Sequence, residues 1–397
     1  MAGPPRPAPD GEDITIIPAL GGEADLRMAP PEHASLAVLA GLTQDAPRVT
    51  PGAGFDGALC LDAPPKLLRN QLDAYVRMAI AEEERARRAR TAAQLEAPAP
   101  SPLSPRYLKV LYIGAPSPAF LSLERAISRR GGLATAAFSS YAGFDHLHDE
   151  RFDAVVLNGA QDTQTAISLC AALRRNASLH HLPTLVITAP HDQTTAAAVI
   201  ERGATGILPV NSPSEGPINW LFEFIARERR RRDAEHEIRA LRDVMGDTRT
   251  GLFRPDAFEA HLSRLAADHH ASGRAISLVA LRVLPAHGAR QPDENTWKRG
   301  FSEIASLAAR LMRETDSGAA LGGDIIIVAL PAARLIAAKR TGERIASVAE
   351  CTAFASGEGS VGPLVFEQNA VELQPGESGA ALLARALRAF EDQSIHA

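Results

Sequence analysis

The 397-residue sequence contains only three cysteines, and they lie far apart, at Cys60, Cys170 and Cys351. Their number and spacing fit neither a disulfide framework nor a zinc site, so we expect small buried thiols in a reducing compartment. The sequence also lacks a run of about 18 apolar residues, which predicts no transmembrane helix and no insertion into a membrane. Its start, MAGPPRPAPDGED, has neither a basic end nor an apolar core, so we expect no signal peptide and a cytoplasmic protein.

The sequence has little excess of charge of either sign. It carries 42 Lys and Arg against 47 Asp and Glu, a net charge of -5. General nucleic-acid binders are usually basic, so we expect no nucleic-acid partner. One arginine cluster, Arg227 and residues 229–232, could instead contact an anionic surface or nucleic acid. The nearby Glu223, Glu228 and Asp233 favour a solvated helix face with paired charges.

A chain of this length is expected to form two or three domains. Residues 1–12 are rich in Pro, Gly and Asp, which predicts disorder. Residues 13–96 form the first predicted module, and the proline-rich stretch 97–105 is the predicted linker. Within the first module we expect strands at 14–17 and 57–61, a helix at 32–42, and a helix from 66 to about 95 with a solvated charged stretch at 82–90.

Residues 106–245 form the second predicted domain, which repeats a strand–helix pattern and ends in a long linking helix. The expected strands are 108–113, 135–139, 154–157, 183–188 and 205–208. The expected helices are about 118–130, 163–175, 192–202 and 214–245. This alternation predicts an α/β, flavodoxin-like fold with a parallel sheet, whose ligand chemistry belongs at the carboxyl ends of the strands.

Residues 108–226 resemble a response-regulator receiver domain, and residues 13–95 resemble a shortened copy of one. The resemblance implies an acidic pair after the first strand, a phosphoacceptor Asp after the third, a Thr or Ser after the fourth and a Lys after the fifth. The residues at these positions are Gly114 and Ala115, Asn158, Thr188, and Val210. Carboxylates are needed for magnesium, and an amide is a poor nucleophile. We therefore predict a pseudo-receiver with no phosphoacceptor, which serves docking or dimerisation.

Residues 246–397 form the third predicted domain. It opens with DTRTGLF at 247–253 and contains Gly322-Gly323-Asp324 between two apolar strands, where the glycines allow a two-residue hairpin. The other expected elements are a strand at 276–284 and helices at 295–313, 332–349 and 378–391. These motifs, in this order, resemble the GGDEF family of diguanylate cyclases, which implies an α+β, cyclase-like fold.

The resemblance also places the residues that cyclase activity requires. Joining two GTP molecules needs magnesium held by carboxylates. The family's first metal-binding Asp corresponds to Arg282, the Glu after Asp324 is replaced by Ile325, and the guanine-binding Asn is replaced by Arg254. We therefore expect no catalytic residues, no metal site and no enzyme activity. Gly322, Gly323 and Asp324 are interpreted as a remnant of a cyclase site.

A second motif of the GGDEF family, Arg-x-x-Asp, has both of its defining residues in this sequence. Arg313-x-x-Asp316 ends five residues before the double glycine, the spacing of the family's inhibitory site for cyclic di-GMP. The resemblance adds Arg340 and Arg344 from the next helix. An arginine fork suits phosphate oxygens and stacks on guanine, and a carboxylate accepts hydrogen bonds from guanine N–H groups. The alternative is a helical ion pair between Arg313 and Asp316, with Arg344 as an ordinary surface residue.

The sequence thus predicts a degenerate GGDEF protein that acts as a cyclic di-GMP receptor and regulates a protein–protein interaction. It needs no cofactor. The resemblance implies a protein partner such as a protease adaptor or cell-cycle regulator, at a cell pole. An apolar stripe of Ile238, Leu241 and Met245 predicts a homodimer through paired helices. The alternatives are an active diguanylate cyclase response regulator that makes cyclic di-GMP from GTP, and a ligand-independent scaffold.

Overall fold

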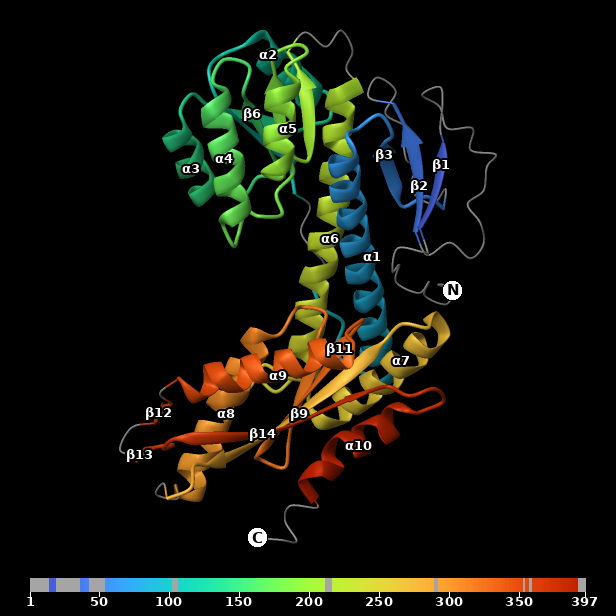
Figure 1. The fold of residues 1–397 in the computed structure, drawn as a ribbon, viewed down its shortest axis with the longest axis vertical. Coiled ribbons are helices and arrows are strands. Elements are labelled where there is room, and N and C mark those ends of the chain that lie inside the picture. Colours follow the sequence, from blue (N-terminus) through green and yellow to red (C-terminus); the bar gives the residue numbers. More distant parts are fainter. Residues whose placement is uncertain are drawn as a thin grey trace. The chain divides into compact units, whose positions relative to one another are not determined.

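The computed structural model describes residues 14–18, 36–42, 54–101, 106–210, 216–288, 292–352, 354–356 and 359–391. The predicted disorder of residues 1–12 lies outside these ranges. The chain divides into two compact units (Figure 1), an N-terminal unit with residues 8–79 and 103–233 and a C-terminal unit with residues 80–102 and 234–397. The division falls inside two helices of 30 residues each, α1 (Pro65–Gln94) and α6 (Gly216–Met245). No helix within the described ranges is long and apolar enough to cross a membrane.

The first sheet of the N-terminal unit corrects one prediction. It consists of three parallel strands in the order β1 (Ile14–Pro18), β2 (Leu36–Gly41) and β3 (Gly57–Cys60). The helix predicted at 32–42 is wrong, because β2 pairs with both neighbouring strands. Its apolar run is buried on both faces: Val38 packs against Tyr75 of α1, and Leu39 packs against Phe224 of α6. A strand covered on both faces shows no alternation that separates it from a helix.

The second sheet of the N-terminal unit confirms the predicted flavodoxin-like fold. Its parallel strands are β4 (Lys109–Ile113), β5 (Leu133–Ala137), β6 (Ala154–Asn158), β7 (Thr184–Thr188) and β8 (Gly206–Pro209). Their spatial order is β5-β4-β6-β7-β8, the 2-1-3-4-5 order of flavodoxin. The helices between them are α2 (Pro118–Ser128), α3 (Ser140–Asp149), α4 (Thr163–Arg175) and α5 (Gln193–Glu201). Helix α3 was not predicted; Gly143 inside it lets the helix lie directly on Ile113 of β4.

The C-terminal unit is built on an antiparallel sheet, as the cyclase-like α+β prediction requires. Its strands are β10 (Ser317–Leu321), β11 (Ile325–Pro331), β9 (Ile276–Pro285) and β14 (Leu364–Glu372), in that spatial order. A short ribbon, β12 (Ala355–Ser356) and β13 (Gly359–Ser360), lies apart from this sheet. The helices are α7 (Pro255–Ser272), α8 (Glu294–Leu311), α9 (Leu335–Glu350) and α10 (Gly379–Glu391). Helices α7 and α10 cover one face of the sheet, and α8 and α9 cover the other.

The apolar stripe of α6 packs within the chain. Ile238 lies against Ala81 of α1, and Leu241 and Met245 join the core between α7 and the sheet. All three side chains of the stripe are 3% exposed or less. The prediction that they pair two copies of the chain is therefore wrong, because their surface is already buried.

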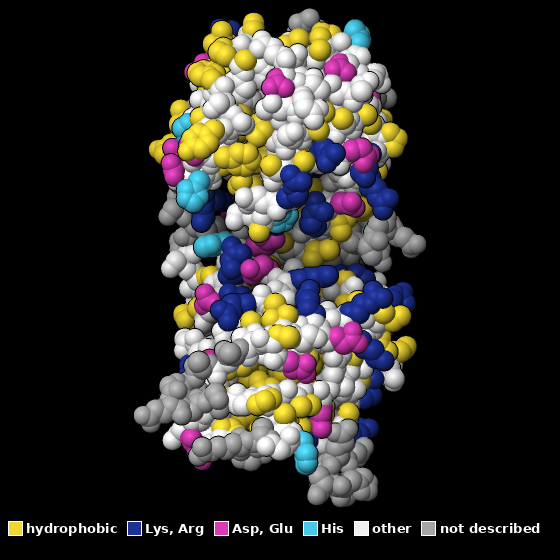
Figure 2. Space-filling model, turned by 60° about the vertical axis from the view of Figure 1, so that its left-hand side comes forward, with side chains coloured by type: hydrophobic (Ala, Val, Ile, Leu, Met, Phe, Trp, Pro, Cys, Tyr) yellow, Lys and Arg dark blue, Asp and Glu magenta, His cyan; other side chains and the backbone are white. Residues whose placement is uncertain are grey.

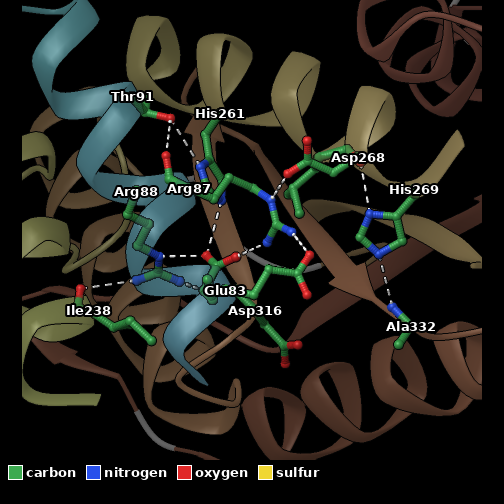
Figure 3. A network of polar contacts seen from close by, with 12 residues as sticks. Glu83, Arg87, Arg88, Thr91, Ile238, His261, Asp268, His269, Asp316 and Ala332 are labelled. Atoms are coloured by element: carbon green, nitrogen blue, oxygen red, sulfur yellow. Dashed lines mark hydrogen bonds and ion pairs between the residues drawn. The ribbon is translucent and has the colours of Figure 1, made fainter. Parts of the chain in front are cut away.

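The charged stretch of α1 at residues 82–90, predicted to be solvated, is also largely buried. Glu83, Glu84, Arg87 and Arg88 are each less than a tenth exposed. Figure 3 shows Glu83, Arg87 and Arg88 grouped with His261 and Asp268 of α7 and with Asp316, which comes directly before β10. Their charges are matched by each other and by partners such as Asp268, and this pairing allows a charged segment to be buried.

The arginine cluster of α6 is paired, as predicted, but is only partly solvated. Arg231 and Arg232 both bind Glu228, and Arg229 binds Asp153. Arg227 is buried over the ring of Tyr75, so the predicted solvated face is wrong for this residue. On the face drawn in Figure 2, basic side chains are interspersed with acidic ones.

The cysteines differ from one another in exposure. Cys60 and Cys170 are buried, and burial raises the pKa of the Cys170 thiol to about 11. Cys351 is exposed just after α9, so the prediction of a buried thiol is wrong there.

Candidate functional site

The Arg-x-x-Asp sequence forms a turn between α8 and β10. Helix α8 ends at Leu311, two residues before Arg313, so the alternative of a helical ion pair is wrong. The Asp316 N–H donates to the Arg313 carbonyl at 3.0 Å, and the Arg313 N–H donates to Asp316 Oδ2 at 2.8 Å. Asp316 is only 6% exposed, and this burial raises the pKa of its carboxyl to about 6. Arg313 is exposed to solvent. The two predicted residues are thus held together by the backbone, with the carboxyl inside and the guanidinium outside.

A cavity of about 380 Å³ lies beside this turn and is lined by both Arg313 and Asp316. Its wall also contains Arg88 of α1, Arg242 of α6 and Arg310 of α8. The remaining lining residues come from the opening motif, the end of α8 and the start of β10; they are Thr250, Gly251, Leu252, Phe253, Ser306, Ala309, Met312, Glu314, Ser317 and Gly318. Four guanidinium groups against two carboxyl groups favour an anionic ligand.

Sequence reasoning missed Arg88 and Arg242. Arg88 is 228 positions from Asp316 in the chain, which it contacts. No local pattern signals such a contact; the one available signal was a charged stretch in a helix that also carries an apolar stripe.

The two residues predicted from α9 stand outside the cavity wall. Arg344 donates from Nη2 to the Leu311 carbonyl at 3.0 Å, which places it beside the turn. Arg340 lies one helical turn earlier, on the exposed surface of α9. The structure therefore brings Arg313 and Asp316 together in the cavity, places Arg344 nearby, and leaves Arg340 apart from it.

Arg88 fixes the turn from its buried side. Its Nη2 donates to the carbonyls of Glu314 at 2.9 Å and Asp316 at 2.8 Å, and its Nη1 donates to the Ile238 carbonyl at 3.2 Å. The guanidinium is in turn held by Glu84, whose Oε1 lies 2.7 Å from Arg88 Nε. One buried side chain of α1 therefore joins α6, through the Ile238 carbonyl drawn in Figure 3, to both ends of the Glu314–Asp316 segment.

Glu84 provides the negative charge at the centre of this network. Its Oε1 also contacts His261 Nε2 at 3.1 Å, and His261 is fully buried. Burial alone raises the pKa of Glu84, but His261 and Arg88 outweigh it and hold that pKa below its ordinary value. Burial lowers the pKa of His261. Glu84 is thus ionised at neutral pH and keeps Arg88 in place.

The Gly-Gly-Asp segment forms a three-residue hairpin loop, one residue longer than predicted. Leu321 pairs with Ile325, which leaves residues 322–324 in the loop. Gly322 and Gly323 have φ values of 64° and 93°, a region that side-chain-bearing residues rarely adopt. Trp297 of α8 donates from Nε1 to the Gly323 carbonyl at 3.0 Å and holds the loop.

Arg282 occupies the space between the carboxylates at this loop. Its Nε lies 3.2 Å from Asp324 Oδ2, and its Nη1 lies 3.7 Å from Glu367 Oε2 on β14. The described ranges contain no group of three or more His, Cys, Asp or Glu side chains arranged to hold a metal ion. Arg254 precedes α7, where its Nε lies 3.7 Å from Asp256 Oδ1, and it lines a separate cavity of about 430 Å³. The Asp324 carboxylate is thus paired with the Arg282 guanidinium.

The side chain at the predicted phosphoacceptor position, Asn158, is held by two hydrogen bonds. Asn158 donates from Nδ2 to the Ala115 carbonyl at 3.0 Å and accepts from the Ala160 N–H at 3.2 Å. Gly114 has a φ of 136°, and a Cβ atom there would lie 2.7 Å from the Asn158 Cβ. The first position of the predicted acidic pair, Gly114, therefore has no room for a side chain. Thr188 is buried at the end of β7.

Comparison with known proteins gives only distant likenesses. No protein-family model matches the sequence, and no curated protein matches it. Among solved structures, the GGDEF domain of DgcB from Caulobacter crescentus, in complex with c-di-GMP, is 20% identical, covers 39% of this chain and 92% of its own, with a TM-score of 0.33. The GGDEF domain of FimX from Pseudomonas aeruginosa is 14% identical, covers 38% and 95%, with a TM-score of 0.34. A response regulator from Chloroflexus aurantiacus is 19% identical, covers 30% and 99%, with a TM-score of 0.29.

Proposed function

We propose that this chain is a cyclic di-GMP receptor without cyclase activity, and that Arg313 and Asp316 bind the ligand. One observation carries the proposal: both residues of the motif line the same cavity, and three further arginines surround it. A cavity of about 380 Å³ falls within the range of roughly 300–1,000 Å³ that is typical of small-molecule sites. The chemistry of its wall suits a ligand with phosphate groups and planar bases.

The two residues take different parts of the ligand in this proposal. Arg313 is exposed, so its guanidinium can turn to a phosphate or stack on a guanine. Asp316 uses Oδ2 to hold the turn, which leaves Oδ1 to accept from guanine N–H groups. Arg344 can add a contact at the edge of the cavity, because it already reaches the Leu311 carbonyl.

The contacts of Arg282 support the absence of cyclase activity in this proposal. A magnesium ion at the loop would need Asp324, which already pairs with the Arg282 guanidinium. The receptor requires no cofactor and no phosphorylation, and the hydrogen bonds that hold Asn158 support the second point.

The output in this proposal is a regulated protein–protein interaction in the cytoplasm. The order of two receiver-like units before a GGDEF-like domain resembles PleD and, more closely, its non-cyclase relative PopA. By that resemblance the partner is a protease adaptor or cell-cycle regulator, at a cell pole. Ligand must bind one arrangement of the protein better than another to change partner binding. Homodimerisation is also part of the proposal, through a surface other than the buried α6 stripe, and light scattering tests it.

Titration calorimetry with cyclic di-GMP tests the proposal on the full chain. We expect saturable binding by the wild type and a loss of about tenfold or more for Arg313→Ala, because a charge-assisted phosphate contact is removed. Arg388→Ala is the matched control, since Arg388 is an exposed arginine on α10 that does not line the cavity. No binding by the wild type, or equal binding by all three proteins, would contradict the proposal. Incubation with GTP and magnesium tests the enzyme alternative, and clear formation of cyclic di-GMP would favour it.

A further inference from the structure

Glu314, the second residue of the Arg-x-x-Asp turn, is the point where this turn meets α6. Its Oε1 lies 3.3 Å from Arg239 Nη1, and its Oε2 lies 3.9 Å from Arg242 Nη1. The two arginines are three positions apart on α6 and so share one face of that helix. Glu314 and Arg242 also line the cavity. The cavity wall thus contains a carboxylate that is already paired with one of its arginines.

The pairing of Glu314 with Arg242 leaves hydrogen-bonding atoms of both side chains without a partner among the described residues. Glu314 Oε2 and Arg242 Nε are both buried, and neither has a hydrogen-bond partner within the described part of the chain. The Ser317 hydroxyl, which also lines the cavity, is buried without a partner too. Buried polar atoms normally find partners, because leaving them unpaired costs free energy. The wall therefore offers hydrogen-bonding groups to whatever enters the cavity. Two of them are donors, and one of these, Arg242 Nε, lies 3.6 Å from Asp243 Oδ1, beyond hydrogen-bond distance.

We propose that Glu314 is a resident counter-ion for Arg242, and that an anionic ligand displaces it from that arginine. The ligand is the phosphodiester of cyclic di-GMP if the function proposed above is correct, and the identity of the anion rests on that function. The exchange itself rests on the geometry of Glu314, Arg239 and Arg242. In this scheme Arg242 binds a phosphate oxygen in the occupied state, and Ser317 donates its hydroxyl hydrogen to the same group.

The ion pairs that the ligand must break, between Glu314 and the two arginines of α6, are weak. The side chains of Glu314, Arg239 and Arg242 are 37%, 42% and 33% exposed, so water screens their attraction. A phosphate can meet the Arg242 fork with two parallel hydrogen bonds, which is a stronger arrangement than a 3.9 Å ion pair. Arg88 does not exchange in this way, because it is 1% exposed and its hydrogen bonds go to Glu84 and three carbonyls.

The exchange would loosen the contact between the turn and α6. Glu314 joins the turn to Arg239 and Arg242, so its displacement removes the side-chain link between the ligand-binding turn and that face of the helix. Ligand occupancy would then change how tightly α6 is held. Glu314 also sets the affinity that an anion needs, because the anion must bind Arg242 more tightly than the Glu314 carboxylate does.

Binding measurements on Glu314→Gln and Arg242→Gln test the exchange in the full chain. We expect Glu314→Gln to bind cyclic di-GMP roughly two- to fivefold more tightly than the wild type, since it no longer competes for Arg242 and the pair that it formed was weak. We expect Arg242→Gln to bind about tenfold more weakly. Adding Glu314→Gln to Arg242→Gln should give little further gain, because the two residues act on each other. Glu343→Gln is the matched control, as it removes one negative charge from an exposed position on α9 outside the cavity.

A second probe separates this inference from the proposed function. Inorganic pyrophosphate, followed by thermal shift, reports on the anion site without requiring recognition of guanine. If neither the wild type nor Glu314→Gln binds cyclic di-GMP, but pyrophosphate stabilises Glu314→Gln more than the wild type, the proposed function fails and the exchange stands. If Glu314→Gln matches the wild type with both probes, or Glu343→Gln shows the same gain, the exchange is wrong. The neutral, nearly isosteric Gln keeps the fold, and the melting temperature without ligand checks this.

Discussion

The Asp316 carboxyl gives a pH dependence whose sign follows from its burial. Burial raises its pKa from the ordinary 3.8 to about 6 in the folded protein. Between these values the folded state holds a proton that the unfolded state has released. The stability contributed by this proton is therefore complete below about pH 4 and is lost as the pH rises through about 6.

The size of the effect follows from the same two pKa values. A difference of about two pH units corresponds to about 3 kcal/mol at about 1.4 kcal/mol for each unit, an upper bound because the turn can relax. Asp316→Asn removes the titration and keeps the acceptor that the Arg313 N–H requires. The free energy of unfolding of the variant, relative to the wild type, should therefore rise by roughly 2–3 kcal/mol between pH 4 and pH 7.

Urea unfolding of the wild type and Asp316→Asn across this pH range measures the difference directly. Titrating groups that do not interact with Asp316 contribute equally to both proteins and cancel in the comparison. Ligand binding supplies a second readout with the opposite sign, because guanine N–H groups need the ionised carboxylate. Affinity for cyclic di-GMP should fall about tenfold for each pH unit below about 6 in the wild type only. Parallel stability curves for the two proteins would refute the burial argument.

Three further substitutions test other parts of the structure. Arg88→Met should lower the free energy of unfolding by about 3 kcal/mol in urea titrations, because it leaves buried carbonyls unpaired; a loss below about 1 kcal/mol would contradict the network. Gly114→Ala should cost about 1–3 kcal/mol in the same assay, since its Cβ meets Asn158 in a left-handed backbone, and an unchanged melting temperature would show that the position is open. Arg282→Asp places a carboxylate beside Asp324, so magnesium should raise the melting temperature of this variant and not of the wild type; equal responses would show that Arg282 does not block a cation.

The parts of the fold that could be predicted are those that local patterns determine. All five strands of the second sheet were predicted to within about two residues of an observed strand, because each is a short apolar run between turn residues. The same approach predicted a helix at strand β2. Val38 and Leu39 are both buried, so the sequence there does not alternate between apolar and polar residues. Strand β14 and helix α3 were missed as well. The paired motif of Arg313 and Asp316 was visible because both residues belong to one turn.

The remaining parts of the site depend on contacts that no local pattern encodes. The acids and arginines at 82–90 have the composition of a solvated helix, and their burial depends on facing partners such as Asp268, His261 and Arg274. These partners lie in a different part of the sequence. A charged stretch has the same composition in a solvated helix and in a buried, charge-paired one. The sequence alone therefore predicted the wrong environment for Arg88.

The burial of Arg88 determines which parts of the chain form the proposed ligand site. The predicted third domain starts at residue 246, yet the cavity needs Arg88 and Arg242, which precede it. Arg88 holds the carbonyls of Glu314 and Asp316, so it determines the position of the turn that presents Arg313. A change in α1 that moved Arg88 by one helical turn would release these carbonyls and alter the site. The geometry of the Arg-x-x-Asp motif is therefore a property of α1 and α6 as much as of the motif. If the proposed ligand binds there, the same contacts give α1 a direct route to control its binding.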